Sequence, residues 1–375
     1  MDGVRIAIML RHLGQHGGGV LVYTRSLLDH LLAQGTDHEF ILLYQDAAHL
    51  GSYAHIDRVT ERVSPHRSRL GWDQVAVPGL LRSTGADVVF NPKYSLPLAS
   101  AIPGVFVCHG LDWYVMPEGS RWIDRLSHRL LIPRYARKAD RIIAVSETAR
   151  DHVLEFLKIP AERVETVHLG VDPRFHVTPT EEARRAARAR FHLPEKYFFY
   201  CGQIYPPKNF ARIVRAFAQV GPPNGYSLVV AGSHTWLSEH EVGLIDDLGL
   251  RPWVVETGWV DRDSLPVLYD LATALIMPSL YEACPSPILE AMAMGCPIVT
   301  ADRYGTAELA GPAAVLVDPE DVEAIAEGMT KVLADDDLRA AIVSAGRERV
   351  RRFTWEKAAS RTLDVLADAA RSRAE

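Results

Sequence analysis

Short apolar runs alternate along the chain with longer segments in which apolar residues recur at helical spacing. This alternation is typical of parallel β-sheets whose strands are joined by crossover helices. The clearest helix covers residues 20–34, where one apolar stripe contains Val20, Tyr23, Leu27 and Leu31. The pattern therefore predicts an α/β fold.

The strand-like runs form two series. The first contains RIAIML, FILLY, DVVF, GVFVCH, RIIAVS and VETVHL, and the second contains YFFYCG, SLVVAG, VVETG, ALIMPS, PIVTA and AVLVD. The segment 173–196 between them is charged and interrupted by prolines, so we expect it to be a junction. We predict one domain over residues 1–172 and a second over residues 197–354.

Length and composition agree with this organisation. A chain of 375 residues is too long for one ordinary core, and its net charge of −6 gives no general attraction to nucleic acid. No apolar run approaches the roughly 18 to 20 residues that span a bilayer, and the N-terminal MDGVRIAIML is predicted to be a strand rather than a signal peptide. The four cysteines are scattered without a Cys-x-x-Cys pair, which favours reduced thiols in a cytoplasm.

The segment 278–299, PSLYEACPSPILEAMAMGCPIV, is the most informative part of the chain. Ser286 followed by a proline predicts a helix start with Ser286 as the N-cap. Glu282 would then lie on the loop after a strand, and Glu290 in the first turn of the helix. Ligands of open α/β sheets bind outside the carboxyl ends of the strands, and two carboxylates there can accept hydrogen bonds from vicinal sugar hydroxyls.

This segment resembles the Glu-seven-Glu motif of the retaining glycosyltransferases of family 4. The likeness continues through GWVDRDSLPVLYDLATALIMPSLYE upstream and PIVTADRYGTAELAGPAAVLVDPED downstream. The resemblance implies the GT-B fold, in which two Rossmann-like, doubly wound parallel-sheet domains face a cleft and the last helix, here residues 355–375, packs on the first domain. It also implies that Glu290 binds the ribose hydroxyls of a nucleotide and Glu282 the hydroxyls of the transferred sugar.

A glycine-rich loop, GQHGGG, follows the first predicted strand and precedes the first long helix. Glycines there let backbone N–H groups approach a phosphate, although the spacing does not match the dinucleotide fingerprint GxGxxG. The family places a comparable loop beside the donor diphosphate, so Gly17, Gly18 and Gly19 are candidates. The alternative is a flexible turn.

A second loop, CGQIYPPKNF, places Lys208 just before a helix predicted to start near Asn209. The ammonium group and the helix dipole would both oppose the charge that grows on a departing diphosphate, while the alternative is a solvated surface lysine. Family members often carry arginines where this chain has Gln203 and Pro207. Because glutamine brings no charge, we expect either another arginine to take over or a slower enzyme.

The elbow between the two glutamates also departs from the family pattern, Glu-Gly-x-Gly-x-Pro. Pro285 has no N–H, so one potential donor to the sugar and phosphate is lost. Ala283, Cys284 and Ser286 still carry backbone amides that could contact the donor.

His109 stands at a strand end in VCHGLD. The matching family histidine lies near the donor sugar, which makes His109 a catalytic candidate together with Lys208 and Glu282. The alternative is a structural histidine. The family string is His-Asp, whereas Gly110 intervenes here, so no aspartate role is transferred.

Two acidic runs and one tryptophan complete the candidates. The DRD of Asp261–Asp263 resembles a metal-binding Asp-x-Asp motif. However, this run and the DDD of residues 335–337 each precede a predicted helix, and the positive end of a helix dipole favours acidic residues there. We therefore expect no metal and no cofactor. Trp259 either stacks on the nucleotide base or packs in the protein.

The segment 121–141 has seven Lys or Arg and two Asp, a local charge of 7 − 2 = +5. Trp122, Leu126 and Leu130 form an apolar stripe on the predicted helix. Such a helix could rest on an anionic membrane. The alternative is an ordinary helix with one core face and one solvated basic face.

Together these features predict a cytoplasmic retaining glycosyltransferase, free or peripheral at the inner membrane face. It would move a hexose from a nucleotide diphosphate sugar to a hydroxyl of a sugar, lipid-linked glycan or small molecule in polysaccharide or glycoconjugate synthesis. The pattern NPKYSLPL…VCHGLDWYVMPEG is similar to polysaccharide-building mannosyltransferases, which favours GDP-mannose over a UDP-hexose. The alternatives are a GT-B nucleotide-sugar epimerase and a catalytically impaired nucleotide-sugar-binding protein.

Overall fold

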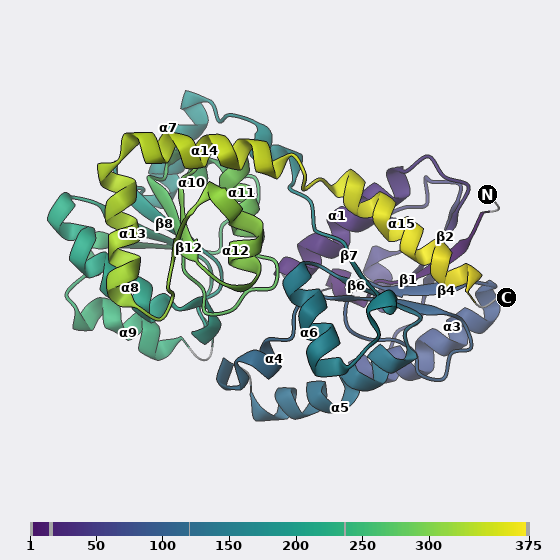
Figure 1. The fold of residues 1–375 in the computed structure, drawn as a ribbon. Coiled ribbons are helices and arrows are strands. Elements are labelled where there is room, and N and C mark those ends of the chain that lie inside the picture. Colours follow the sequence, from purple (N-terminus) through teal and green to yellow (C-terminus); the bar gives the residue numbers. More distant parts are fainter. Residues whose placement is uncertain (1–2, 15–17, 120, 236–237, 373–375) are drawn as a thin grey trace. The chain divides into compact units, whose positions relative to one another are not determined.

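The computed structural model describes residues 3–14, 18–119, 121–235 and 238–372 (Figure 1). The chain forms two compact units. Unit 1 comprises Met1–Leu111, Arg121–Gly170 and Trp355–Glu375, and unit 2 comprises Asp112–Ser120 and Val171–Thr354. Residues 112–120 belong to unit 2, although the sequence pattern predicted them in the N-terminal domain. The segment 173–196 also belongs to unit 2, in place of the separate junction expected from the sequence.

Unit 1 is built on a seven-stranded sheet in the order β3-β2-β1-β4-β5-β6-β7, with every described pairing parallel. Its strands are β1 (Arg5–Met9), β2 (Glu39–Tyr44), β3 (Val59–Val63), β4 (Val88–Asn91), β5 (Gly104–Cys108), β6 (Arg141–Ala144) and β7 (Val164–Thr166). Strands β1 and β4 are neighbours although β2 and β3 come between them in the sequence. The winding direction of the chain therefore reverses between β1 and β4.

The helices of unit 1 are α1 (Gly19–Ala33), α2 (Arg69–Gly71), α3 (Val77–Thr84), α5 (Trp122–Lys138), α6 (Glu147–Leu157) and α15 (Trp355–Arg371). Helix α15 comes from the end of the chain and packs against α1 (Figure 1). The ring of Trp355 lies 5.6 Å from that of Tyr23, and Gln34 Nε2 donates to the backbone oxygen of Glu356 at 3.3 Å.

Unit 2 is built on a six-stranded parallel sheet in the order β10-β9-β8-β11-β12-β13. Its strands are β8 (Tyr197–Cys201), β9 (Ser227–Ala231), β10 (Val254–Gly258), β11 (Ala274–Met277), β12 (Ile298–Ala301) and β13 (Val315–Val317). The winding direction reverses between β8 and β11. Phe198, Tyr200 and Ile276 are fully buried, as expected for a parallel sheet covered on both faces.

The helices of unit 2 are α4 (Asp112–Val115), α7 (Glu181–Phe191), α8 (Phe210–Val220), α9 (Glu239–Asp247), α10 (Leu265–Leu271), α11 (Ser286–Met294), α12 (Tyr304–Ala310), α13 (Val322–Ala334) and α14 (Asp336–Val350). Helices α8 and α13 pack together over the sheet. The two doubly wound parallel sheets confirm the predicted α/β fold class. Within the described ranges, every helix is too short or too polar to cross a membrane, and the four cysteines form no disulfide bond with one another.

Candidate active site

The loops after β8 and β11 are tied together at the reversal point of unit 2. Asn209 adopts the left-handed conformation (φ 62°) between a short 3-10 turn, Pro206–Lys208, and α8. Its buried amide Nδ2 donates to the backbone oxygens of Pro278 at 2.8 Å and Pro319 at 2.6 Å. The backbone N–H of Leu280 donates to the oxygen of Pro207 at 2.8 Å. These bonds hold Lys208 against the loop that carries Glu282.

Lys208 and Glu282 form a direct ion pair between Nζ and Oε1, and each side chain is only 13% exposed. Ser279 Oγ donates to the same carboxylate oxygen at 3.2 Å. Burial alone would lower the pKa of Lys208, but the charge of Glu282 opposes this effect, and the net pKa is raised. The ammonium group is therefore charged at neutral pH.

Glu290 lies on α11 and is 5% exposed. Tyr269 Oη donates to its Oε2 at 3.0 Å, and Arg262 Nη1 lies 3.6 Å from Oε1. Burial raises the pKa of Glu290, against the opposing effects of Arg262 and Tyr269. Arg262 Nη2 also lies 3.6 Å from Asp172 Oδ2, so this guanidinium faces two carboxylates.

The start of α11 differs by one residue from the expectation. Pro285 is the N-cap, Ser286 is the first helical residue, and no side chain caps the helix. Glu290 is thus the fifth helical residue and begins the second turn instead of lying in the first. Proline suits the cap position because the N–H that it lacks would have no partner within the helix.

The elbow before α11 is held by close contact with α12. The backbone N–H of Gly305 donates to the oxygen of Glu282 at 2.9 Å. A Cβ at Gly305 would come within 2.0 Å of the Ala283 oxygen, so only glycine permits this approach. Within the described residues, the backbone N–H groups of Glu282 and Ala283 donate to no other residue.

Cys201, the last residue of β8, lies near both the Lys208–Glu282 pair and the Arg262–Glu290 pair. Burial and the charge of Glu290 together raise the pKa of its thiol to about 12, while Lys208 and Arg262 act in the opposite direction. The thiol therefore lies within the electrostatic reach of all three. Two acids and two cations thus surround the carboxyl end of β8, where α/β sheets bind ligands.

Asp112, which the sequence reasoning set aside, lies close to this group. It begins α4, and the adjoining turn Pro117–Gly119 packs against Pro206–Lys208. Burial raises the pKa of Asp112, and the negative charge of Glu282 raises it further. The segment 112–119 therefore lies beside the Lys208–Glu282 pair.

The remaining candidates of unit 2 lie near the surface. The side chain of Gln203 is exposed and that of Cys284 is partly buried. Trp259 follows β10 and is 64% exposed. Most of its side chain is therefore accessible to solvent.

His109 follows β5 in unit 1, where its ring meets that of Tyr23 edge-on at 4.7 Å. The carbonyl oxygen of Pro92 lies 2.7 Å from Nε2, and because a carbonyl only accepts, Nε2 carries the proton. Burial lowers the pKa of His109 to about 4. The imidazole is therefore neutral at pH 7, with Nδ1 as a hydrogen-bond acceptor.

The glycine loop begins α1 in unit 1. Gly18 is the N-cap with φ 99°, and Gly19 is the first helical residue. The oxygen of Gly18 accepts from the backbone N–H groups of Leu21 and Val22. Gly17 lies outside the described residues.

Sequence comparisons identify the family. A model of the group 1 glycosyl transferases matches residues 183–349, and a model of glycosyltransferase family 4 matches residues 17–175. The chain belongs to glycosyltransferase family 4. The O-antigen chain mannosyltransferase B of Escherichia coli is 28% identical to this glycosyltransferase over 74% of the chain and 73% of that protein. The D-inositol 3-phosphate glycosyltransferase of Salinispora arenicola is 31% identical over 62% of the chain, which spans 55% of that relative's length.

A solved structure of HepE from Anabaena, in complex with UDP and glucose, shares the fold of this glycosyltransferase. The TM-score is 0.78 at 18% identity, over 97% of this chain and 100% of HepE. The two doubly wound parallel sheets are therefore those of the GT-B fold.

The acidic runs of the glycosyltransferase have structural partners. Asp261 accepts hydrogen bonds from the backbone N–H and Oγ of Ser264 before α10, and Asp335 caps α14 by accepting from Leu338 N at 2.8 Å. In the described part of the chain, no three His, Cys, Asp or Glu side chains gather as metal ligands would.

Helix α5 of the glycosyltransferase buries a different set of residues than its apolar stripe. Its buried residues are Ile132, Tyr135 and Ala136. The stripe itself is exposed, with Trp122 at 66%, Leu126 at 51% and Leu130 at 50%. The core face of α5 is therefore formed by residues of its C-terminal half and not by this stripe.

Proposed function

We propose that this glycosyltransferase moves a hexose from a nucleotide diphosphate sugar to an acceptor hydroxyl, with retention at the anomeric carbon. The observation that supports this proposal is the group of two acids and two cations around the end of β8, formed by Lys208, Glu282, Arg262 and Glu290. Carboxylates suit the hydroxyls of sugars, and cations suit a diphosphate. A nucleotide diphosphate sugar contains both kinds of group.

Each member of this group has a role in the proposal. Glu290, buried beside Tyr269 and Arg262, accepts hydrogen bonds from the ribose hydroxyls. Glu282 holds the transferred sugar, and Lys208 stabilises the departing diphosphate. The unpaired N–H groups of Glu282 and Ala283 are additional donors to phosphate or sugar oxygens.

Arg262 supplies the charge that Gln203 and Pro207 do not. It follows β10 and lies within electrostatic reach of the same thiol as Lys208. We assign it the role that an arginine of the β8 loop has in many family members. Trp259, three residues earlier and exposed, is available to stack on the nucleotide base.

GDP-mannose is our first donor candidate because one relative is named as a mannosyltransferase of O-antigen chains. HepE was solved with UDP and glucose, so UDP-glucose is the second. The reaction would need no metal and take place in the cytoplasm, with the acceptor hydroxyl on a glycan.

A donor screen followed by product analysis tests the proposed function. The thermal shift of the protein is measured with UDP, GDP and ADP sugars, and each donor that binds is incubated with and without a mixture of glycan acceptors. We expect the sugar to be transferred to an acceptor. We also expect NMR to show that the anomeric configuration of the transferred sugar is the same in the product as in the donor. Inversion would exclude the retaining mechanism, conversion of donor without acceptor would indicate an epimerase, and binding without turnover would indicate a binding protein.

We also propose that α5 rests on an anionic membrane surface. The exposed Trp122, Ile123, Leu126 and Leu130 supply the apolar contact, and segment 121–141 carries a charge of 7 − 2 = +5. Aromatic and aliphatic side chains flanked by arginines are typical of helices that lie in the membrane interface. This contact would bring the enzyme to lipid-linked acceptors.

A further inference from the structure

Unit 1 carries basic residues at the carboxyl edge of its sheet. Arg11 follows β1, Arg67 follows β3, and Lys93 follows β4, while Arg69 begins α2. The winding direction reverses between β1 and β4, so Arg11 and Lys93 flank the point where an open α/β sheet binds its ligand. The reversal point of unit 1 is therefore basic, whereas that of unit 2 holds two acids and two cations.

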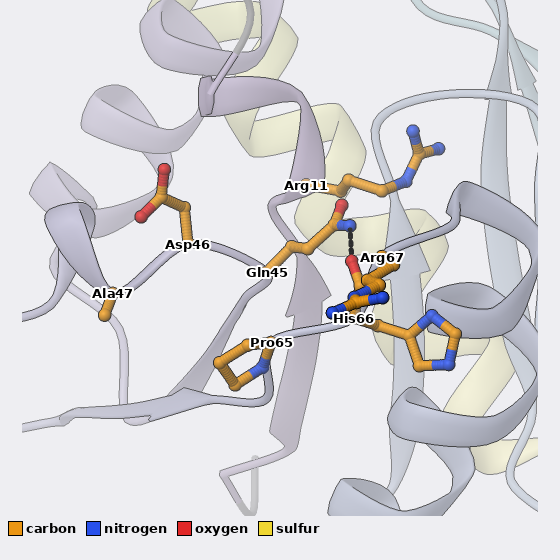
Figure 2. Close-up of a pocket in the computed structure, with 7 residues that line it drawn as sticks. All are labelled: Arg11, Gln45, Asp46, Ala47, Pro65, His66 and Arg67. Atoms are coloured by element: carbon orange, nitrogen blue, oxygen red, sulfur yellow. Dashed lines mark hydrogen bonds between the residues drawn. The ribbon is translucent and has the colours of Figure 1, made fainter.

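The three arginines line two cavities, Arg11 and Arg67 the larger and Arg69 the smaller. A groove of about 820 Å³ is lined in part by Arg11, Gln45, Asp46, His66 and Arg67, which come from the three segments that follow β1, β2 and β3 (Figure 2). Gln45 Nε2 donates to the oxygen of His66 at 2.6 Å, the dashed bond in Figure 2. A smaller cavity of about 170 Å³ is lined in part by Arg69 and Asp73. The groove is large enough for a sugar derivative, since small-molecule sites span roughly 300 to 1,000 Å³.

Asp46 lines the groove and Asp73 the smaller cavity, so two acids stand against the four cations Arg11, Arg67, Arg69 and Lys93. Asp73 Oδ1 lies 3.4 Å from Arg11 Nε, and both side chains are buried at 2% and 8% exposure, so this pair is neutral overall. Arg67, Arg69 and Lys93 have no carboxylate within 4.0 Å in the described part of the chain. Burial and the nearby charges of Arg69 and Arg11 lower the pKa of Lys93 to about 8. An anion would relieve this repulsion.

The Lys93 loop is held in place beside His109. Asn91 Oδ1 accepts from the backbone N–H of Lys93 at 3.0 Å, and its Nδ2 donates to the oxygen of Ser95 at 2.8 Å. The oxygen of Pro92 accepts from His109 Nε2. In addition to burial, the charge of Lys93 lowers the pKa of His109. The ammonium group and the candidate catalytic imidazole are therefore neighbours within unit 1.

We propose that Arg69 and Lys93 bind a phosphate group of the acceptor, so that the substrate receiving the sugar is a phosphorylated glycan or polyol. This inference rests on the proposed function. A phosphate ester carries about −1.5 to −2 charges at pH 7, which matches several cations better than one carboxylate would. Arginine and lysine form charge-assisted bonds to its oxygens. Two sources share this chemistry, a water-soluble sugar phosphate and a lipid-linked diphosphate.

Binding of inorganic pyrophosphate tests the site without catalysis. It is titrated by calorimetry into protein saturated with UDP or GDP, so that the phosphate-binding groups of unit 2 are occupied. The variants are Lys93→Met and Arg69→Gln, and the matched control is Arg82→Gln, an exposed arginine on α3. We expect Kd to rise at least about 10-fold in the first two variants, as for loss of a charge-assisted hydrogen bond, and to stay unchanged in the control.

The outcomes separate this proposal from the proposed function. Equal pyrophosphate affinity in wild type, Lys93→Met and Arg69→Gln would overturn the phosphate site, with melting curves and nucleotide affinity confirming that the variants are folded. If no nucleotide binds, the proposed function fails, while a pyrophosphate affinity that depends on Lys93 still supports the site.

Acceptor kinetics test the substrate class. A hexose phosphate and a polyprenyl diphosphate sugar are each compared with the phosphate-free sugar. We expect KM to be at least 10-fold lower for one phosphorylated acceptor, and this advantage to disappear in Lys93→Met with less change in kcat. The preferred compound identifies the soluble or the lipid-linked source. Equal kcat/KM for phosphorylated and neutral acceptors in the wild type would overturn the proposal.

Discussion

The ammonium group of Lys208 pairs with the carboxylate of Glu282, 74 residues further along the chain, where each side chain is only 13% exposed. Two charges that are shielded from water are stable only together, because each lacks the hydration that it would have in the unfolded chain. The pair that we assign to the donor site therefore also stabilises the fold of unit 2.

The first prediction concerns this pair. Lys208→Met should lower the free energy of unfolding by about 3 to 5 kcal/mol, since it leaves a buried carboxylate without its partner. The double variant Lys208→Met/Glu282→Gln should recover much of this loss, while both proteins lose transfer activity. Urea denaturation measures the difference. A double variant that is less stable than Lys208→Met alone would contradict the role of the pair.

The second prediction concerns the pH dependence of Glu290. Because its pKa is higher in the folded protein than in the unfolded chain, its favourable contribution is complete below the ordinary glutamate pKa of 4.5 and is lost as pH rises through the raised value. Glu290→Gln should therefore gain stability relative to wild type between pH 4.5 and pH 7. Thermal melting across this range checks the slope, and a constant difference between the two proteins would show that Glu290 does not titrate there.

The third prediction concerns Arg262, which faces both Asp172 and Glu290. Arg262→Gln should weaken nucleotide sugar binding by roughly 10- to 100-fold, the effect of removing one charge-assisted contact. Arg251→Gln is the matched control, because Arg251 pairs with Asp246 and Glu256 near the surface of unit 2, where an ion pair contributes about 0 to 1 kcal/mol. Equal donor affinity in both variants would remove Arg262 from the site.

The fourth prediction separates the two nitrogens of His109. Asparagine can present an acceptor near the position of Nδ1, whereas glutamine can preserve the donor to Pro92. If Nδ1 contacts the substrate, His109→Asn should retain more transfer activity than His109→Gln, as measured by kcat/KM. The reverse order would assign His109 a structural role.

The depressed pKa of His109 also predicts an effect on acid stability. The unfolded chain binds this proton more tightly than the folded protein, so the contribution of His109 is complete above pH 6.5 and is lost as pH falls towards about 4. His109→Gln should therefore lose less stability than wild type over this interval, by up to about 1.4 kcal/mol per pH unit.

The fifth prediction concerns the exposed stripe of α5. Trp122→Ser/Leu126→Ser should reduce sedimentation with vesicles that contain phosphatidylglycerol, while leaving the melting temperature unchanged because both side chains are exposed in the wild type. Leu248→Ser, at an exposed position of unit 2, is the control. Wild-type protein that does not sediment with these vesicles would refute the membrane contact.

Burial explains how much of the fold could be predicted from the sequence. In the described structure, the predicted apolar runs coincide with every strand except β3, because strands of a parallel sheet are covered on both faces. Strand β3 reads VTERV and lies at the sheet edge, partly exposed, so its apolar signal is weak. The segment 173–196 resembled a linker through its charge, but helix α7 satisfies part of that charge by pairing Arg184 with Asp270.

For the candidate site, the sequence predicted which residues follow strands but not which of their side chains contact one another. Glu282 and Lys208 follow strand-like runs, and this placed both at a carboxyl edge. Their direct pairing depends on the sheet order, which makes β8 and β11 neighbours. Arg262 was missed because the acids on either side of it were assigned to the start of the next helix, although its place soon after β10 marked the same edge.

The position of α15 has a consequence for biosynthesis. The face of α1 that contacts Trp355 is synthesised before unit 2, while its covering helix emerges from the ribosome after unit 2. Unit 1 therefore cannot complete its folding until all of unit 2 has been synthesised. During that interval its nascent apolar surface is a natural target for chaperones, and a truncated chain ending before Trp355 would be prone to aggregate.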